Sequence, residues 1–277
     1  MRFAVGLPNV KEYADPPLLV DLAVTAESAG WDGVFVWDHL LYREGGAAVN
    51  PWLTMAAIAQ ATNQIRLGVM VVALARRRPW NVAREAAALD ILSNGRLLFG
   101  AGLGSLDDEF TRFGEDAGAR VRADKLDESL EIITGLWSGG PFRYEGKHFR
   151  IEEVRFLPAP LQTPRVPVLV AGMWPNRRPF RRAARWDGIF ATHEQVGHTE
   201  TMTVEQLREI VDYTLTHRAE TETPFDIVIE GQTPGPDSQI AAAYAQAGLT
   251  WWVEKLGWFR GTLEEMGDRI ESGPPRD

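Results

Sequence analysis

The chain of 277 residues is 45% hydrophobic and 24% charged, a composition typical of a folded globular protein. Its formal net charge of -9 disfavours nucleic acid as a partner, and its lack of cysteine excludes disulfides, thiolate metal sites and cysteine nucleophiles. No run approaches the ~18 apolar residues of a membrane span, and the first residues do not form a secretory signal, so we expect a cytoplasmic protein without a membrane partner.

Short apolar runs alternate with longer segments of helical periodicity along the whole chain. The expected strands are residues 3–7, 32–36, 66–72, 97–101, 168–171, 188–191, 225–229 and 251–253. The expected helices are residues 18–29, 52–61, 80–92, 123–137, 180–185, 204–217, 239–247 and 263–270. This alternation predicts parallel strands closed into a (β/α)8 TIM barrel, which forms a single domain over residues 1–277.

The ends of the predicted segments carry residues suited to them. Gly30 follows the first helix, where a left-handed residue is favoured, and Pro79 begins the third, where a missing N–H does no harm. Residues 141–156 place aromatic and β-forming residues around a glycine-containing turn, which predicts an inserted β-hairpin. An open doubly wound sheet is the alternative, but the glycines of residues 100–104 do not have the G-x-G-x-x-G spacing that it requires.

The binding site of such a barrel is formed where each strand leads into the following helix. The residues at these positions are Pro8, Asn9, Trp37, Asp38, His39, Val72, Ala73, Gly102, Leu103, Gly104, Gly172, Met173, Trp174, Thr192, His193, Glu194, Glu230 and Glu254. Glycines let a ligand approach the backbone, aromatic side chains wall it, and a few polar groups orient it. The mixture predicts a large, flat organic ligand.

Metal chemistry and nucleophilic hydrolysis find no support in the sequence. The five histidines form neither an H-x-H nor an H-E-x-x-H pattern, and no G-x-S-x-G turn occurs, so no metal is expected. A barrel enzyme acting on sugar phosphates, with residues 172–178 as the phosphate site, is a further alternative. The Lys/Glu or metal constellation of such an enzyme is missing.

Three stretches together resemble the luciferase-like monooxygenase superfamily, whose members use flavin or the deazaflavin F420. They are residues 89–104 (LDILSNGRLLFGAGLG) with Glu109-Phe110 after them, residues 26–33 (AESAGWDG) leading to Asp38-His39, and residues 182–188 (RAARWDG). The resemblance covers most of the chain. It implies a barrel enzyme with the cofactor ring across its mouth, and hydride transfer between that ring and a small organic substrate.

The resemblance also implies where the cofactor binds. The implied contacts are Asp38, Val71, Val72, Ala73, Gly102, Gly104, Ala171, Gly172, Met173, Trp174, Arg177 and Arg178. In the family the third strand often ends with a non-prolyl cis peptide against the ring, which here falls within residues 71–73. The phosphate site of the family corresponds to residues 172–178, where N–H groups at a helix start and Arg177 or Arg178 would bind the anion.

Two features indicate F420 as the cofactor, with FMN as the alternative. Leu103 stands where many FMN-dependent relatives carry a phosphate-binding arginine, and Asp38-His39 is frequent in F420-dependent relatives, although FMN users with Asp-His exist. If the cofactor is FMN, the resemblance implies an FMNH2-dependent monooxygenase with a partner flavin reductase. The superfamily also contains non-catalytic flavin-binding subunits, and its members are often homodimers.

His39 is the expected catalytic residue, because a histidine side chain ordinarily titrates near neutrality and can carry a proton while hydride moves. Asp38 either orients His39, binds a cofactor hydroxyl or caps a helix. Glu109 is the third catalytic candidate, although its acidic run, residues 107–109, is typical of a solvated loop. The arginine run at residues 76–78 is interpreted most simply as a solvated loop, with contact to an anionic ligand tail as the alternative because the run lies close to a strand end.

Overall fold

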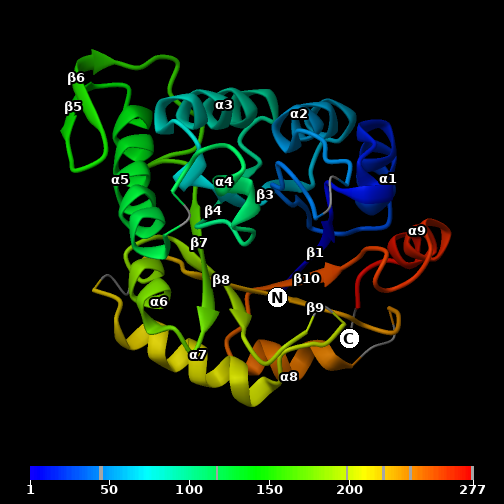
Figure 1. Ribbon diagram of the computed structural model, residues 1–277. Helices are drawn as coiled ribbons and strands as arrows, with labels where there is room; N and C mark the ends of the chain where they lie inside the picture. Colours follow the sequence, from blue (N-terminus) through cyan, green and yellow to red (C-terminus); the bar gives the residue numbers. More distant parts are fainter. Residues whose placement is uncertain (44–45, 117, 198, 220–221, 237–238, 276–277) are drawn as a thin grey trace.

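In the computed structural model, eight parallel strands of the described chain close on themselves in the order β1-β10-β9-β8-β7-β4-β3-β2, inside a ring of helices (Figure 1). The structure describes residues 1–43, 46–116, 118–197, 199–219, 222–236 and 239–275. The barrel strands are β1 (Arg2–Leu7), β2 (Gly33–Val36), β3 (Arg66–Ala73), β4 (Leu97–Gly102), β7 (Val168–Trp174), β8 (Gly188–His193), β9 (Asp226–Gly231) and β10 (Trp251–Lys255). The predicted TIM barrel is therefore confirmed.

The helices begin where the sequence supplies suitable end groups. They are α1 (Pro16–Ser28), α2 (Pro51–Ala61), α3 (Pro79–Leu92), α4 (Asp108–Thr111), α5 (Ala119–Trp137), α6 (Arg177–Ala183), α7 (Val204–Thr216), α8 (Ile240–Gln246) and α9 (Leu263–Glu271), with 3-10 turns at Lys11–Tyr13 and Leu74–Arg76. Proline opens α1, α2 and α3, and Thr203 and Thr262 form capping boxes with Gln206 and Glu265. Within the described residues, no helix has the length and apolarity needed to cross a bilayer.

The inserted hairpin is present as predicted. Strands β5 (Pro141–Glu145) and β6 (Arg150–Arg155) pair antiparallel and project beyond α5 in Figure 1. Glu128 of α5 accepts hydrogen bonds from the backbone N–H groups of Lys147, His148 and Phe149 at 2.8–3.1 Å. One carboxylate thus ties the hairpin turn to the helix.

The alternation of side chains along the strands sets what faces the barrel interior. The lumen is filled by a cluster that includes Phe35, Val228 and Trp251, whereas Trp252 points outward onto Tyr244 of α8, with ring centroids 5.2 Å apart. Two residues further along β9 the same face carries Glu230. The top layer of the barrel interior is therefore polar, and it forms the floor of the candidate site.

The departures from the expected boundaries that affect the candidate site lie at β7 and α6. Strand β7 continues to Trp174 instead of ending at residue 171, because its ladder with β8 extends through Met173 and Trp174. Helix α6 then begins at Arg177 and not at residue 180.

Candidate functional site

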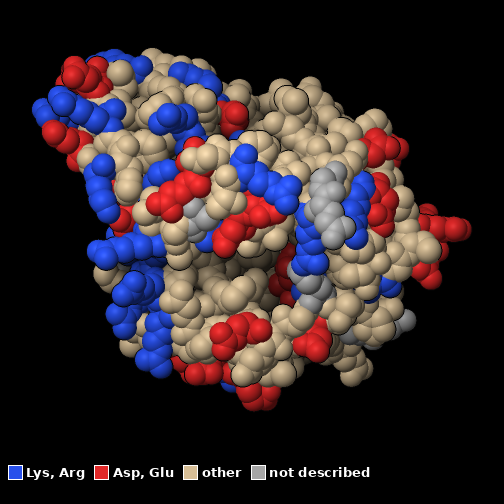
Figure 2. Space-filling model, in the orientation of Figure 1, with Lys and Arg blue, Asp and Glu red and all other residues tan. Residues whose placement is uncertain are grey.

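A cavity of about 640 Å³ opens at the C-terminal ends of the strands, and Figure 2 shows the hollow in this face. Nine of the predicted site residues line it: Asp38, His39, Val71, Ala73, Gly104, Glu109, Ala171, Gly172 and Met173. Its lining also includes Trp37, Leu103, His193 and Glu230, which the strand ends had indicated, and Arg76 and Lys255, which they had not. The cavity lies within the ~300–1,000 Å³ range usual for cofactor and small-molecule sites.

His39 is held by a buried carboxylate from the loop after β4. Its Nδ1 lies 3.2 Å from Oε1 of Glu109, and the same oxygen accepts the N–H groups of Leu40 at 2.6 Å and Leu41 at 3.1 Å. Arg76 Nη1 donates to the second oxygen, Oε2, at 3.0 Å. An ionised carboxylate can only accept a hydrogen bond, so a neutral imidazole carries its proton on Nδ1. Nε2 is then the unprotonated ring nitrogen.

Glu109 is 1% exposed, whereas Asp107 and Asp108 before it are exposed, so the acidic run is solvated except at Glu109. Burial by itself would raise the pKa of this carboxyl, but the hydrogen bond from His39 and the charge of Arg76 outweigh burial and hold the pKa below its usual range. The group is therefore a fixed negative charge beside the imidazole.

Asp38 contacts the loop after β3 instead of His39. Its oxygens accept Arg77 Nη2 at 2.6 Å, Arg77 Nε at 3.1 Å and the N–H of Ala73 at 3.2 Å. Arg76 Nη2 donates to the backbone oxygen of Asp38. The structure thus assigns the orientation of His39 to Glu109, and the contacts of Asp38 are those of an anchor for residues 73–77.

The interpretation of residues 76–78 as a solvated loop is wrong for two of the three arginines. The side chains of Arg76 and Arg77 are 4% and 22% exposed, and Arg78 alone is exposed. A buried charge needs a partner, and Asp38 and Glu109 supply it from two other loops. In the sequence, the ion pairs are indicated only by the presence of acidic and basic residues at the ends of neighbouring strands.

At the wall formed by β3 and β4, the cis peptide and two of the expected cofactor contacts do not lie where they were predicted. The non-prolyl cis bond lies between Met70 and Val71, one position before the predicted 71–73, and the β3–β4 register shifts between Val69 and Val72. Val71 lines the cavity, but Val72 is fully buried and does not, because neighbouring strand residues face opposite ways. Gly102 lies behind Val71, where a Cβ would come 2.5 Å from Val71 Cγ2.

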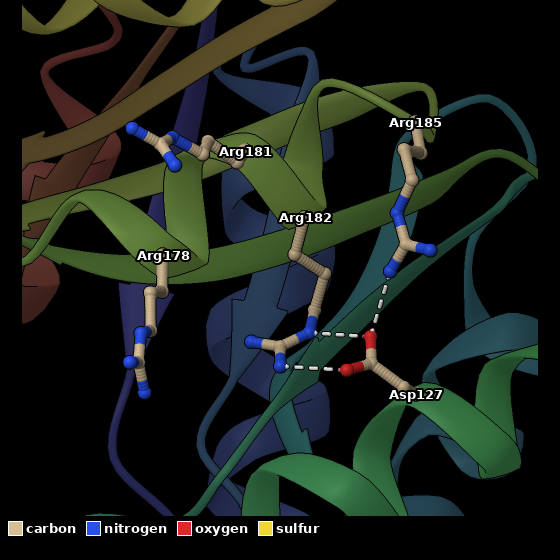
Figure 3. Close-up of a pocket in the computed structure, with 5 residues that line it drawn as sticks. All are labelled: Asp127, Arg178, Arg181, Arg182 and Arg185. Carbon is tan, nitrogen blue, oxygen red and sulfur yellow. Dashed lines mark hydrogen bonds and ion pairs between the residues drawn. The ribbon is translucent and has the colours of Figure 1, made fainter.

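Three predicted phosphate contacts lie outside the cavity. Trp174 is 3% exposed and packs on Phe180 and Tyr213, with ring centroids 5.2 and 5.3 Å away. Arg177 stacks over Tyr213 at 5.2 Å, and Arg178 lies on the outer side of α6 (Figure 3). The cause is the longer β7, which turns Met173 into the lumen and Trp174 out of it, and the earlier start of α6.

A second charged pair lies on the floor of the cavity. Glu230 at the end of β9 has its Oε2 4.0 Å from Nζ of Lys255 on β10, and Trp37 donates a hydrogen bond to the carboxyl. Burial raises the pKa of Glu230, although Lys255 and Trp37 oppose it. Glu254, expected at the mouth, is instead fully buried outside the lumen against Arg260 and Thr233, and Glu194 is exposed.

Comparison with curated proteins finds F420- and flavin-dependent relatives. The chain is 34% identical to an F420-dependent hydroxymycolic acid dehydrogenase of Mycobacterium tuberculosis, over 62% of this chain and 48% of that protein. It is 30% identical to an F420-dependent glucose-6-phosphate dehydrogenase of Microbacterium testaceum, over 83% and 67%. It is 31% identical to the oxygenase component of a flavin-dependent trigonelline monooxygenase of Acinetobacter baylyi, over 58% and 44%. The match therefore spans about half the length of the first and third relatives.

Solved structures share the fold. The monooxygenase RslO1 from Streptomyces bottropensis superposes with a TM-score of 0.77 at 21% identity, covering 98% of this chain and 97% of that one. An F420-dependent secondary alcohol dehydrogenase in complex with an F420-acetone adduct gives 0.71 at 18% identity, covering 99% and 84%. The family model for luciferase-like monooxygenases matches residues 1–273. The chain belongs to the luciferase-like monooxygenase family.

Proposed function

We propose that the protein is an oxidoreductase that binds F420 at the barrel mouth and transfers hydride between this cofactor and a small organic substrate, with His39 carrying the accompanying proton. The observation that carries the proposal is the His39–Glu109–Arg76 network, which lines the cavity. When bound, the deazaflavin ring supplies a carbon atom that gives or accepts a hydride. FMN is the alternative cofactor.

The lining of the cavity fits a flat heteroaromatic ring. Val71, Leu103 and Ala171 present apolar side chains to the cavity from three different wall segments. Gly104 adopts a φ of +84°, and a Cβ there would come 2.9 Å from Phe110, so this position favours glycine on two counts. Because Gly104 has no side chain, the cavity keeps space here for a ring to lie against the backbone.

The proton role of His39 follows from its contacts. Glu109 holds the Nδ1 edge, so Nε2 is the atom that would exchange a proton with a substrate oxygen. Arg76 Nη1 binds the other oxygen of the Glu109 carboxylate at 3.0 Å and so holds that carboxylate in place beside the ring. Glu109 and Arg76 are positioning residues, and His39 is the catalytic residue of the proposal.

The FMN alternative rests on the flavin-dependent relative and would make the protein a monooxygenase component supplied by a flavin reductase. Leu103 stands where many FMN-dependent members of the family carry a phosphate-binding arginine, and this difference supports F420 instead. A non-catalytic flavin-binding role would need the cavity but not the buried Glu109–Arg76 pair. The presence of that pair beside His39 supports an enzyme.

Separate titrations of the purified protein with F420 and FMN, followed by fluorescence, test the cofactor. We expect saturable F420 binding at micromolar concentration; binding of neither cofactor would overturn the proposal. The role of His39 is tested with His39→Ala, with the exposed His217→Ala as the matched control. Against a panel of secondary alcohols and ketones, His39→Ala should keep F420 affinity and lose ~10²- to 10⁴-fold in turnover, whereas unchanged turnover would refute the role.

A further inference from the structure

A second hollow, of about 310 Å³, lies on the outside of the molecule between α5 and α6. Figure 3 shows the five side chains that line it: Asp127, Arg178, Arg181, Arg182 and Arg185. Four guanidinium groups and one carboxylate give this patch a net charge of +3, in a chain whose net charge is -9. We call the four arginines the α6 arginine surface. In Figure 2, basic side chains gather along this edge of the molecule.

Two of the four arginines are fixed by the single acidic residue. Arg182 donates to Asp127 through Nε at 2.6 Å and Nη2 at 2.8 Å, and Arg185 Nη2 donates to the same carboxylate at 2.8 Å. Because this carboxylate neutralises one unit of charge, it orders the two groups without cancelling the field of the patch. Figure 3 shows Asp127 at one end of the row.

The other two arginines keep donors for a ligand. Arg181 Nε donates to the hydroxyl of Tyr213 at 2.6 Å, which holds the side chain, and its terminal nitrogens form no hydrogen bond or ion pair within the described part of the chain. Arg178 is exposed and makes no hydrogen bond or ion pair with any residue that the structure describes. Guanidinium groups with free, oriented N–H donors are the groups that proteins use for carboxylates and phosphates.

The arginine surface and the barrel mouth are connected through α6. Asn176 and Pro179 line the mouth cavity, and Arg178, between them in sequence, lines the outer hollow. The first turn of α6 therefore separates the two hollows. A ligand with its ring in the mouth and a long anionic tail that passes this turn would reach Arg178 first, and Arg181 and Arg182 beyond it.

We propose that the α6 arginine surface binds the oligoglutamate tail of F420, and so favours this cofactor over FMN. The inference rests on the proposed function. F420 continues beyond its phosphate into a lactyl group and a chain of glutamates that carries several carboxylates, whereas FMN ends at its phosphate. Only F420 therefore has negatively charged groups that can reach a surface outside the mouth.

The test compares dissociation constants for F420 with its glutamate tail and for the same deazaflavin without glutamates but with its phosphate and lactyl groups. We expect the tailed form to bind ~10-fold more tightly to the unaltered protein at low salt. In the double variant Arg178→Gln/Arg181→Gln this advantage should fall below ~3-fold. The matched control is Arg150→Gln on the exposed edge of β6, which should leave the advantage unchanged.

Salt gives a second measurement on the unaltered protein, and it decides the matter even if the double variant does not fold. Raising ionic strength from ~0.05 to ~0.5 M should weaken the tailed form more than the tail-less form, because exposed charges are screened. Equal affinity of the two forms, or an equal loss of both in the double variant, would overturn the inference and leave the proposed function standing. Binding of FMN but of neither deazaflavin would overturn the F420 proposal together with the inference.

Discussion

Replacing Glu109 by glutamine removes the negative charge at the centre of the network that holds His39. Glutamine keeps one acceptor oxygen for the N–H groups of Leu40 and Leu41, but it places an NH2 group where Oε2 accepts from Arg76 at 3.0 Å. Loss of one partner of a buried ion pair costs about 3–5 kcal/mol. Asp38, whose Oδ2 lies 3.5 Å from Arg76 Nη2, offsets part of this cost. We expect a loss of ~3 kcal/mol in the free energy of unfolding at pH 7.

The assay is urea unfolding of the wild type and Glu109→Gln, with the exposed Glu194→Gln as control. Because the folded-state pKa of Glu109 lies below its usual range, its contribution is present above the ordinary carboxyl pKa and is lost as pH falls through the folded value. The difference between wild type and variant should therefore be full at pH 7 and shrink in acid. A difference below ~1 kcal/mol at pH 7, or one that does not change between neutral and acid pH, would refute the reasoning.

Two further predictions concern the floor and the wall of the cavity. Burial raises the folded-state pKa of Glu230, so its ionisation costs stability once pH exceeds the ordinary carboxyl range. Glu230→Gln keeps an acceptor for Trp37 and should be more stable than the wild type at pH 8, and the gain should vanish in acid. Thermal melts at both pH values test this. An effect of the substitution that is the same at both pH values would contradict it. Gly102→Ala would push a methyl group to 2.5 Å from Val71 Cγ2 and should cost ~1–3 kcal/mol and weaken cofactor binding. The control Gly267→Ala, in α9, meets no atom within 4 Å and should be neutral or stabilising, and equal effects of both alanines in urea unfolding would contradict the packing argument.

The barrel could be predicted because each strand–helix unit is indicated by a pattern within a short stretch of consecutive residues. The apolar run of β4 and the proline that opens α3 are local signals, and neither depends on distant contacts. The hairpin at residues 141–156 is equally local. The predicted end of β7 was wrong, because pairing with β8 extends the strand beyond its apolar run to Trp174.

The charged network of the mouth depends on contacts that no local pattern contains. Arg77 meets Asp38 across 39 positions of sequence, and Glu109 meets His39 across 70. A run of three arginines reads as solvent-exposed until two carboxylates from other loops converge on it. Lys255 was missed for another reason: β10 extends two residues beyond the expected strand, which brings the lysine into the lumen layer.

The two carboxyl groups of the mouth differ because their neighbours differ. Glu109 receives two backbone N–H groups, an imidazole and a guanidinium, and these donors hold its pKa low in spite of burial. Glu230 has one indole donor and an ammonium group 4.0 Å away, which do not offset burial, so its pKa is raised. One cavity therefore holds a carboxyl whose pKa is lowered and a carboxyl whose pKa is raised, a separation typical of sites that assign different proton roles to two acids. Glu109, the carboxyl with the lowered pKa, is the one that contacts His39, so it supplies an anion beside the residue proposed to carry the proton.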